Sequence, residues 1–251
     1  RTNPTMSSKF RFDEFKEIKQ LEKIREYAEN FLEMLGFGSS RGAWLLSGRY
    51  VLKIALNPAG ISQNKSEVEV YSNPKTKAII AKVHRTNPDY MWVIADLVRP
   101  LTSEKEFEEL TGIEFRRFSS NVMVGLGQGD DESPDTMHDL VAATITTIKD
   151  NDMMPADIVW RPPSTRAPFD HWGKTPDGRV VLLDYGFTRE VWKKHYRPKT
   201  LATDPKPNAQ TIRQVAAAEK RPAPATDKDV ESMTVTGDGA LADTADAYHL
   251  G

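Results

Sequence analysis

One stretch of the chain, residues 36–56, reads GFGSSRGAWLLSGRYVLKIAL. Apolar residues dominate its second part and a Ser-Gly-Arg turn interrupts them, which predicts a hairpin of two strands, Ala43–Leu46 and Tyr50–Leu56. Ahead of the hairpin, Gly36 and Gly38 allow the backbone to approach a phosphate group with its N–H groups directed inward. No Gly-Lys-Ser/Thr follows, and strands rather than a helix come next, so the stretch is neither a P-loop nor a dinucleotide-binding fingerprint. A plain turn is the alternative.

A lysine lies in the middle of the second predicted strand. Because Lys53 is surrounded by apolar residues, its ammonium group either reaches solvent or pairs with an acid. The Asn-Pro pair at residues 57–58 opens a helix that we expect to reach about Tyr71. Glu67 and Glu69 lie roughly 200° apart around this helix, so only one of them faces the sheet. We assign that role to Glu67.

An acidic residue follows a buried strand near the end of the patterned part of the chain. Val180–Leu183 is continuously apolar and runs directly into Asp184, which Tyr185 and Gly186 follow. A carboxylate at the end of a buried strand, before a turn of small residues, is well placed to hold a divalent cation. A structural turn without a ligand is the alternative interpretation.

The remaining pattern predicts an α+β protein in two lobes. Further predicted elements are a helix over Phe12–Met34, strands over Ala78–Val83 and Met91–Leu97, a helix opened by a capping box at Ser103, and a helix over Asp135–Lys149. We expect four parts: an N-terminal arm and helix (1–34), a β-rich small lobe (35–101), a helical lobe with the Asp-Tyr-Gly hairpin (102–199) and an extended, low-complexity tail (200–251).

The tail differs in composition from the rest of the chain. Residues 200–251 contain no Trp or Phe and one Tyr, but four prolines, and eight acids against five bases. Such a segment buries too little apolar surface to offset the entropy of ordering it. We therefore expect the tail to bind other protein chains.

Composition excludes several classes of function. The 251 residues include 34 Lys and Arg against 36 Asp and Glu, a net charge of −2, so no nucleic-acid partner is evident. No apolar run approaches the roughly 18 residues of a membrane span, and residues 1–30 carry charges throughout, so we expect no signal peptide there. The absence of cysteine excludes disulfides and a thiolate nucleophile.

In order and spacing, the glycine-rich stretch, Lys53, Glu67 and the Asp-Tyr-Gly turn together resemble the protein-kinase-like fold over residues 35–187. The strings QNKSE (63–67) and GRVVLLDYG (178–186) also resemble uncharacterised kinase-like proteins encoded by tailed bacteriophages. This second resemblance implies a protein of the host-cell cytoplasm or of a virion.

The resemblance implies roles for particular residues. Lys53 would contact the α- and β-phosphates of ATP, Glu67 would pair with Lys53, and Asp184 would hold Mg²⁺. The phosphate-facing loop would include Gly36, Gly38 and Arg41. The inter-lobe hinge that receives the adenine would be Asp96-Leu97-Val98.

The chain departs from the family pattern in the loop and in the catalytic segment. Arg41 replaces the third glycine of the loop, where it either binds a phosphate or fills its space. The family has a catalytic Asp followed five residues later by a metal-binding Asn, whereas here His171 stands at the Asn position. Asp157 lies fourteen residues before it and Asp170 directly precedes it. Asp157 keeps the role of base if the intervening proline-rich insertion loops out. Imidazole suits transition metals better than Mg²⁺.

The segment after Asp-Tyr-Gly is also too short for a peptide-docking platform, since only residues 187–196 precede the Pro-rich tail. The first hypothesis is therefore a degenerate, pseudokinase-like domain that acts as a binding or assembly module, associated with a phage virion and retaining nucleotide binding. No cofactor is required for this scaffold role. The alternative is an active ATP-dependent phosphotransferase, with ATP and Mg²⁺ as cofactors and a small molecule as substrate. An accidental resemblance is a third interpretation.

Overall fold

The computed structural model describes residues 9–128, 138–159 and 168–197 and confirms a mixed α+β protein. The described residues form two compact units, one of residues 9–64 and 83–97 and the other of residues 65–82 and those from 98 onward. The predicted tail (200–251) lies outside the described residues, as does the beginning of the helix expected from Asp135. Among the described helices, none combines the length and the apolar character that crossing a bilayer needs.

The first unit is built on a five-stranded antiparallel sheet of order β1-β2-β3-β5-β4. Both edge strands contain a register shift, between Met34 and Gly36 in β1 and between Val83 and Arg85 in β4. The strands are β1 Glu33–Phe37, β2 Arg41–Leu45, β3 Tyr50–Ala55, β4 Val83–Thr86 and β5 Trp92–Asp96.

Three of the predicted strands are confirmed as β2, β3 and β5, but the strand expected over Ala78–Val83 is wrong. Only Ile80 makes an isolated bridge there, and β4 begins at Val83. Ile79, Ile80 and Ala81 are buried without a strand ladder of their own. A short apolar run indicates burial, but it does not by itself define secondary structure.

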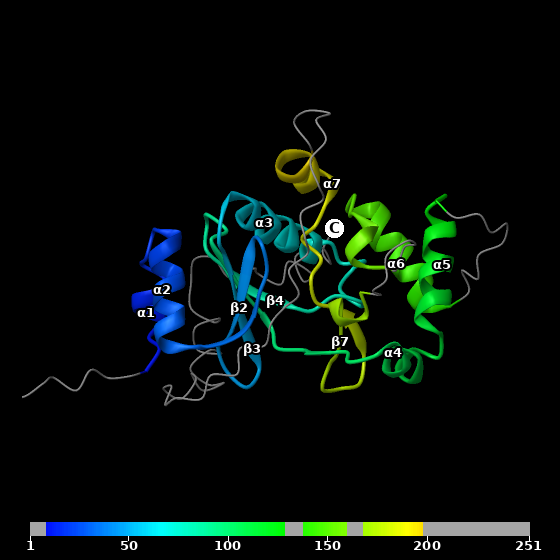
Figure 1. The fold of residues 1–251 in the computed structure, drawn as a ribbon, viewed down its shortest axis with the longest axis horizontal. Coiled ribbons are helices and arrows are strands. Elements are labelled where there is room, and N and C mark those ends of the chain that lie inside the picture. Colours follow the sequence, from blue (N-terminus) through cyan, green and yellow to red (C-terminus); the bar gives the residue numbers. More distant parts are fainter. Residues whose placement is uncertain (1–8, 129–137, 160–167, 198–251) are drawn as a thin grey trace, which may run out of the picture. The chain divides into compact units, whose positions relative to one another are not determined.

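The single N-terminal helix expected over Phe12–Met34 is also wrong. The chain forms α1 (Phe12–Phe15), a turn, and α2 (Leu21–Phe31), and β1 begins at Glu33. Gln20 has extended backbone angles and separates the two helices. In Figure 1, α1 and α2 lie together beside the sheet.

The two N-terminal helices cover one face of this sheet. Phe15, Ile24 and Ala28 are fully buried, and they pack in one cluster with inward residues of the sheet: Trp44, Leu46, Tyr50, Leu52, Ile54, Trp92 and Ile94. Side chains alternate between the two faces of a strand. Lys53 therefore lies on the face of β3 that is opposite to α1 and α2.

Helix α3 (Pro58–Ser72) follows β3, as predicted, and its residues 58–64 belong to the first unit and 65–72 to the second. Gly60 N–H is capped by Asn57 Oδ1 at 3.1 Å, which confirms the expected role of Asn57 as an N-cap.

The second unit combines helices with a three-stranded sheet of order β6-β7-β8. Ser103 accepts a hydrogen bond from the Glu106 N–H and begins α4, as the capping-box pattern predicts. The rings of Phe107, Phe115, Phe118 and Trp172 contact one another in its core. Figure 1 shows α5 and α6 side by side. The elements are α4 Glu104–Thr111, α5 Phe115–Gly125, α6 Asp139–Asp150, α7 Arg189–Val191, β6 Arg99–Pro100, β7 Trp172–Lys174 and β8 Val180–Leu182, with the short helices η1 Pro155–Asp157, η2 Phe169–His171 and η3 Trp192–Tyr196.

The N-terminal helices are part of the core of the first unit, and this leads to a stability prediction. Phe15→Ala removes a fully buried ring and should lower the free energy of unfolding by about 3–5 kcal/mol. Phe37→Ala removes the same side chain from a site that is 45% exposed and should cost about 1 kcal/mol or less. Urea denaturation of both variants measures the difference. A loss for Phe15→Ala as small as that expected for Phe37→Ala would show that α1 does not contribute to the core.

Candidate functional site

Lys53 lies at the centre of the five-stranded sheet. Ala43 of β2 and Val93 of β5 are its cross-strand partners, and its side chain is partly exposed. Ala55 and Ala95 share this face. Both alanines are buried, as is Val93, so Lys53 is a partly exposed cation among covered apolar side chains. A cation in such a setting attracts an anionic group that approaches the same face.

The glycine-rich stretch forms the hairpin between β1 and β2. Gly36 lies within β1, Gly38 lies in the turn, and Arg41 begins β2. The Gly38 N–H donates to the Arg41 carbonyl at 2.8 Å and closes the turn. The Arg41 guanidinium donates to Asn64 Oδ1 at 3.3 Å, so the side chain is directed toward α3.

Glu67 and Glu69 of α3 have different surroundings. The Glu67 side chain is fully buried, whereas Glu69 is exposed and forms an ion pair with Lys65 at 3.6 Å. Directly before Glu67, the Ser66 hydroxyl lies 3.3 Å from the hydroxyl of Thr188, two residues after Gly186. The part of α3 that carries Glu67 therefore lies next to the segment that follows Asp-Tyr-Gly, within the second unit.

The hinge expected at Asp96-Leu97-Val98 starts at the end of β5. The Asp96 carboxylate lies 2.6 Å from Nε2 of His84 on the neighbouring strand β4, and the His84 ring packs edge-on against Tyr50 at 4.8 Å. The Leu97 N–H donates to the Arg49 carbonyl at 2.8 Å. Nothing in the sequence pattern singles out His84 as the partner of Asp96, because their pairing depends on the register of two strands.

Three predicted site residues lie close together in the second unit: Asp157, His171 and Asp184. His171 ends η2 directly before β7, and its carbonyl accepts from the Leu183 N–H at 2.8 Å, directly before Asp184. The His171 ring joins the main chain of Asp157 through a contact of 2.8 Å between Nδ1 and the Asp157 carbonyl. Trp172 supports the same connection, since its Nε1–H donates to the Ile158 carbonyl at 3.0 Å. Asp157 thus lies beside the hairpin that leads to Asp184.

The contact with Asp157 determines which nitrogen of the His171 ring carries the proton. A carbonyl oxygen only accepts hydrogen bonds, so Nδ1 must be the donor. In the neutral ring, Nε2 then carries the lone pair and is able to accept a proton or bind a metal ion.

Asp184 is exposed, in contrast to the residue that follows it. Tyr185 is buried, and its hydroxyl donates to the Ala81 carbonyl at 2.7 Å. An exposed carboxylate beside a fixed main chain suits Mg²⁺, which proteins bind through one or two carboxylates together with substrate phosphates. Within residues 9–128, 138–159 and 168–197, no three or more His, Asp or Glu side chains group closely enough to hold a metal ion by themselves.

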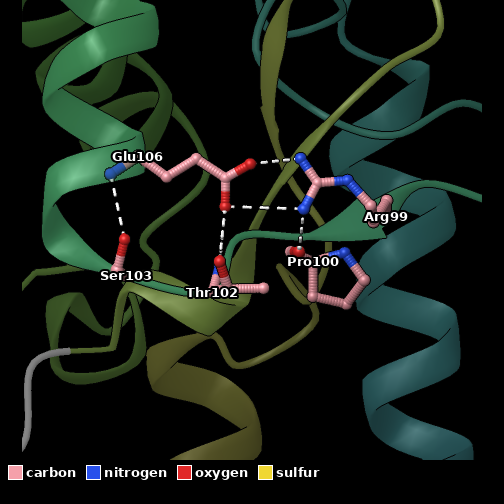
Figure 2. Close-up of polar contacts among 5 residues, drawn as sticks. All are labelled: Arg99, Pro100, Thr102, Ser103 and Glu106. Atoms are coloured by element: carbon pink, nitrogen blue, oxygen red, sulfur yellow. Dashed lines mark hydrogen bonds and ion pairs between the residues drawn. The ribbon is translucent and has the colours of Figure 1, made fainter.

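The chain that follows Val98 is fixed by an ion pair, drawn in Figure 2. Arg99 of β6 binds the carboxylate of Glu106 on α4 through two guanidinium nitrogens. The same carboxylate accepts from both the N–H and the hydroxyl of Thr102, each at 2.9 Å. These hydrogen bonds lower the pKa of Glu106 to about 2. The hydrogen bond from Arg99 has the largest effect, followed by those from the Thr102 N–H and hydroxyl.

Comparison with solved structures finds a similarity that comparison of sequences does not. No protein-family model matches the chain, and no curated protein matches it. Among solved structures, the ternary complex of APH(2″)-IIa with streptomycin and ATP is similar, with 15% sequence identity and a TM-score of 0.29. The match covers 56% of this chain and 46% of that chain, so the chain corresponds to less than half of that protein's length.

The lowered pKa of Glu106 predicts a pH-dependent contribution to stability. A carboxyl group whose pKa is lower in the folded protein stabilises the fold when it is ionised. The contribution should be complete above about pH 4.5, the ordinary pKa, and should disappear as the pH falls toward 2.

Urea denaturation of the wild type and of Glu106→Gln between pH 7 and pH 2 measures this contribution. We expect the wild type to be more stable at pH 7 and the difference to vanish near pH 2. Glu109→Gln on the same helix, whose side chain is 62% exposed, is the control and should change stability little at any pH. A difference that does not depend on pH would contradict the assignment.

Proposed function

We propose that the chain is a kinase-like domain that binds a nucleoside triphosphate. The observation that carries the proposal is the order of elements around Lys53. The lysine lies on the third strand of the sheet, after a glycine-rich hairpin, and the next element is a helix that carries a buried glutamate. Protein kinases place their phosphate-binding lysine, its partner glutamate and the glycine-rich loop in this order.

The second unit supports the same proposal with an independent set of residues. Asp184 follows β8 as an exposed carboxylate, and Tyr185 is anchored through its hydroxyl beside it. In the proposed function, Lys53 would neutralise phosphate charge. Asp184 would help to hold Mg²⁺, which would supply further positive charge for the phosphates. The main chain of residues 96–98 contacts the adenine edge.

Phosphoryl transfer to a small molecule is the second candidate function. The observation that favours it is the hydrogen bond from the His171 ring to the Asp157 carbonyl, which holds Asp157 beside the hairpin that leads to Asp184. Asp157 then takes the proton of an acceptor hydroxyl, the task of the catalytic Asp in kinases. Among the described residues, only α7 and η3 follow Phe187, which favours a small acceptor over a peptide.

The role in assembly remains a prediction from the sequence. It depends on residues 200–251, which lie outside the described residues, and the association with a phage virion depends on the sequence resemblance alone. Under this hypothesis the domain is pseudokinase-like and the nucleotide has a structural role.

Mg-ATP should stabilise the wild-type protein against heat. At about 100 times the dissociation constant, a ligand that binds only the folded state adds about 2.7 kcal/mol, which corresponds to a rise in Tm of roughly 5–10 °C for a protein of this size. Lys53→Met keeps most of the apolar stem but removes the charge, and Asp184→Asn removes the carboxylate charge from an exposed site. Both variants should lose most of the rise, as measured by differential scanning fluorimetry.

Lys105→Met is the matched control for Lys53→Met, because the Lys105 side chain is 83% exposed on α4. It should keep the full Mg-ATP response. The proposal fails if millimolar Mg-ATP leaves the Tm of the wild type unchanged, or if Lys53→Met responds as the wild type does.

A turnover measurement separates the second candidate from the assembly hypothesis. If Asp157 is the base, Asp157→Asn should lower the rate of phosphoryl transfer to small hydroxyl acceptors at least about 100-fold, while Mg-ATP still raises the Tm. Asp170→Asn, the neighbouring carboxylate, should keep the rate, and so should deletion of residues 200–251. The assembly hypothesis predicts instead that this deletion abolishes binding to other chains and that Lys53→Met does not.

A further inference from the structure

The turn between β1 and β2 is fastened to the beginning of α3 by hydrogen bonds from both its main chain and its side chains. Asn57 Nδ2 donates to the Ser39 carbonyl at 2.9 Å, and the Leu56 N–H donates to the Ser40 carbonyl at 2.8 Å. The Ser40 hydroxyl donates to Gln63 Oε1 at 2.9 Å, and both of these side chains are buried. We call this set of contacts the turn–helix clamp.

Gly60 makes the close approach of the turn to α3 sterically feasible. A Cβ atom at Gly60 would lie 2.0 Å from the Ser40 carbonyl oxygen and 3.0 Å from the Ala55 Cα, both main-chain atoms. A Cβ at Gly38, inside the turn, would meet only the Arg41 carbonyl, at 3.4 Å, an ordinary contact distance. The glycine that the clamp requires is therefore in the helix and not in the turn.

Asn64 extends the clamp to a third segment of the first unit. Its side chain is fully buried, accepts from the Arg41 guanidinium at 3.3 Å and donates to the Tyr90 carbonyl at 2.8 Å. Tyr90 lies in the turn before β5 and has a positive φ of 54°. One amide thus joins the hairpin, the helix and the turn before β5.

We propose that Gly60, Gln63 and Asn64 are positioning residues that make the β1–β2 turn and the first turns of α3 move as one body. This inference rests on the proposed function, in which the turn faces the phosphates. Gly60, Gln63 and Asn64 all lie in the first two turns of α3, so a displacement of the β1–β2 turn displaces this part of the helix. The turn is then already positioned when the nucleotide binds. Arg41 contributes to the clamp through its hydrogen bond to Asn64.

Amide hydrogen exchange on the full chain without nucleotide tests the clamp itself. Gly60→Ala inserts a methyl group against the Ser40 carbonyl, so the Leu56 N–H should exchange at least tenfold faster than in the wild type. Alanine favours a helix more than glycine does, so faster exchange does not come from a weaker helix. Gly38→Ala is the matched control and should leave the Leu56 rate within twofold.

The dissociation constant of Mg-ATP tests whether the clamp positions the turn for the nucleotide. Gly60→Ala and Gln63→Met should each weaken binding at least fivefold, and the exposed-site control Lys105→Met less than twofold. The effects of Ser40→Ala and Gln63→Met should add to less than their sum in the double variant, because both remove the hydrogen bond between these side chains.

Two results would overturn the inference: wild-type exchange at Leu56 in Gly60→Ala, or unchanged Mg-ATP affinity in a variant whose Leu56 exchange is faster. Failure of the wild type to bind Mg-ATP would instead overturn the proposed function together with the positioning role. The exchange measurement would then still decide whether the turn and α3 are joined.

Discussion

The arrangement of the first unit depends on the alternation of side chains along β3. Leu52 and Ile54 are fully buried in the cluster with the N-terminal helices, and the residue between them, Lys53, must then point to the other face. A shift of one residue in the register of β3 would bury the ammonium group among aromatic rings, at a large cost in free energy. The apolar cluster on one face therefore determines the chemistry of the other.

Several parts of this arrangement could be predicted from local sequence. The hairpin of β2 and β3, the start of α3 at Asn57 and the cap at Ser103 depend on residues that are close along the chain. The break between α1 and α2 could not be predicted, because apolar residues keep a helical spacing across it while the main chain at Gln20 is extended. In contrast, α5 has a local signal that predicts a helix, because Phe115, Phe118 and Val122 follow a helical spacing and are all fully buried.

The candidate site shows the same division between local and distant contacts. The positions of Lys53 and Asp184 at a strand centre and a strand end follow from the apolar runs that flank them. The contact between His171 and Asp157 joins a ring to a main-chain carbonyl fourteen residues away. The spacing of apolar residues along the chain does not indicate such a contact. Likewise, Gln63 and Asn64 are polar residues that are buried because they satisfy hydrogen bonds of the hairpin, and a hydrophobic pattern does not report such contacts.

The register shifts in β1 and β4 have a consequence for the protein in crowded solution. A regular edge strand exposes a row of main-chain donors and acceptors that recruits strands of other molecules and leads to aggregation. Both edges of this sheet are irregular, and β1 also carries the exposed Leu35 and Phe37. A bulge bends and twists an edge so that a second flat strand pairs poorly with it. The irregularities thus help to keep a sheet with exposed apolar residues from growing by the addition of further chains.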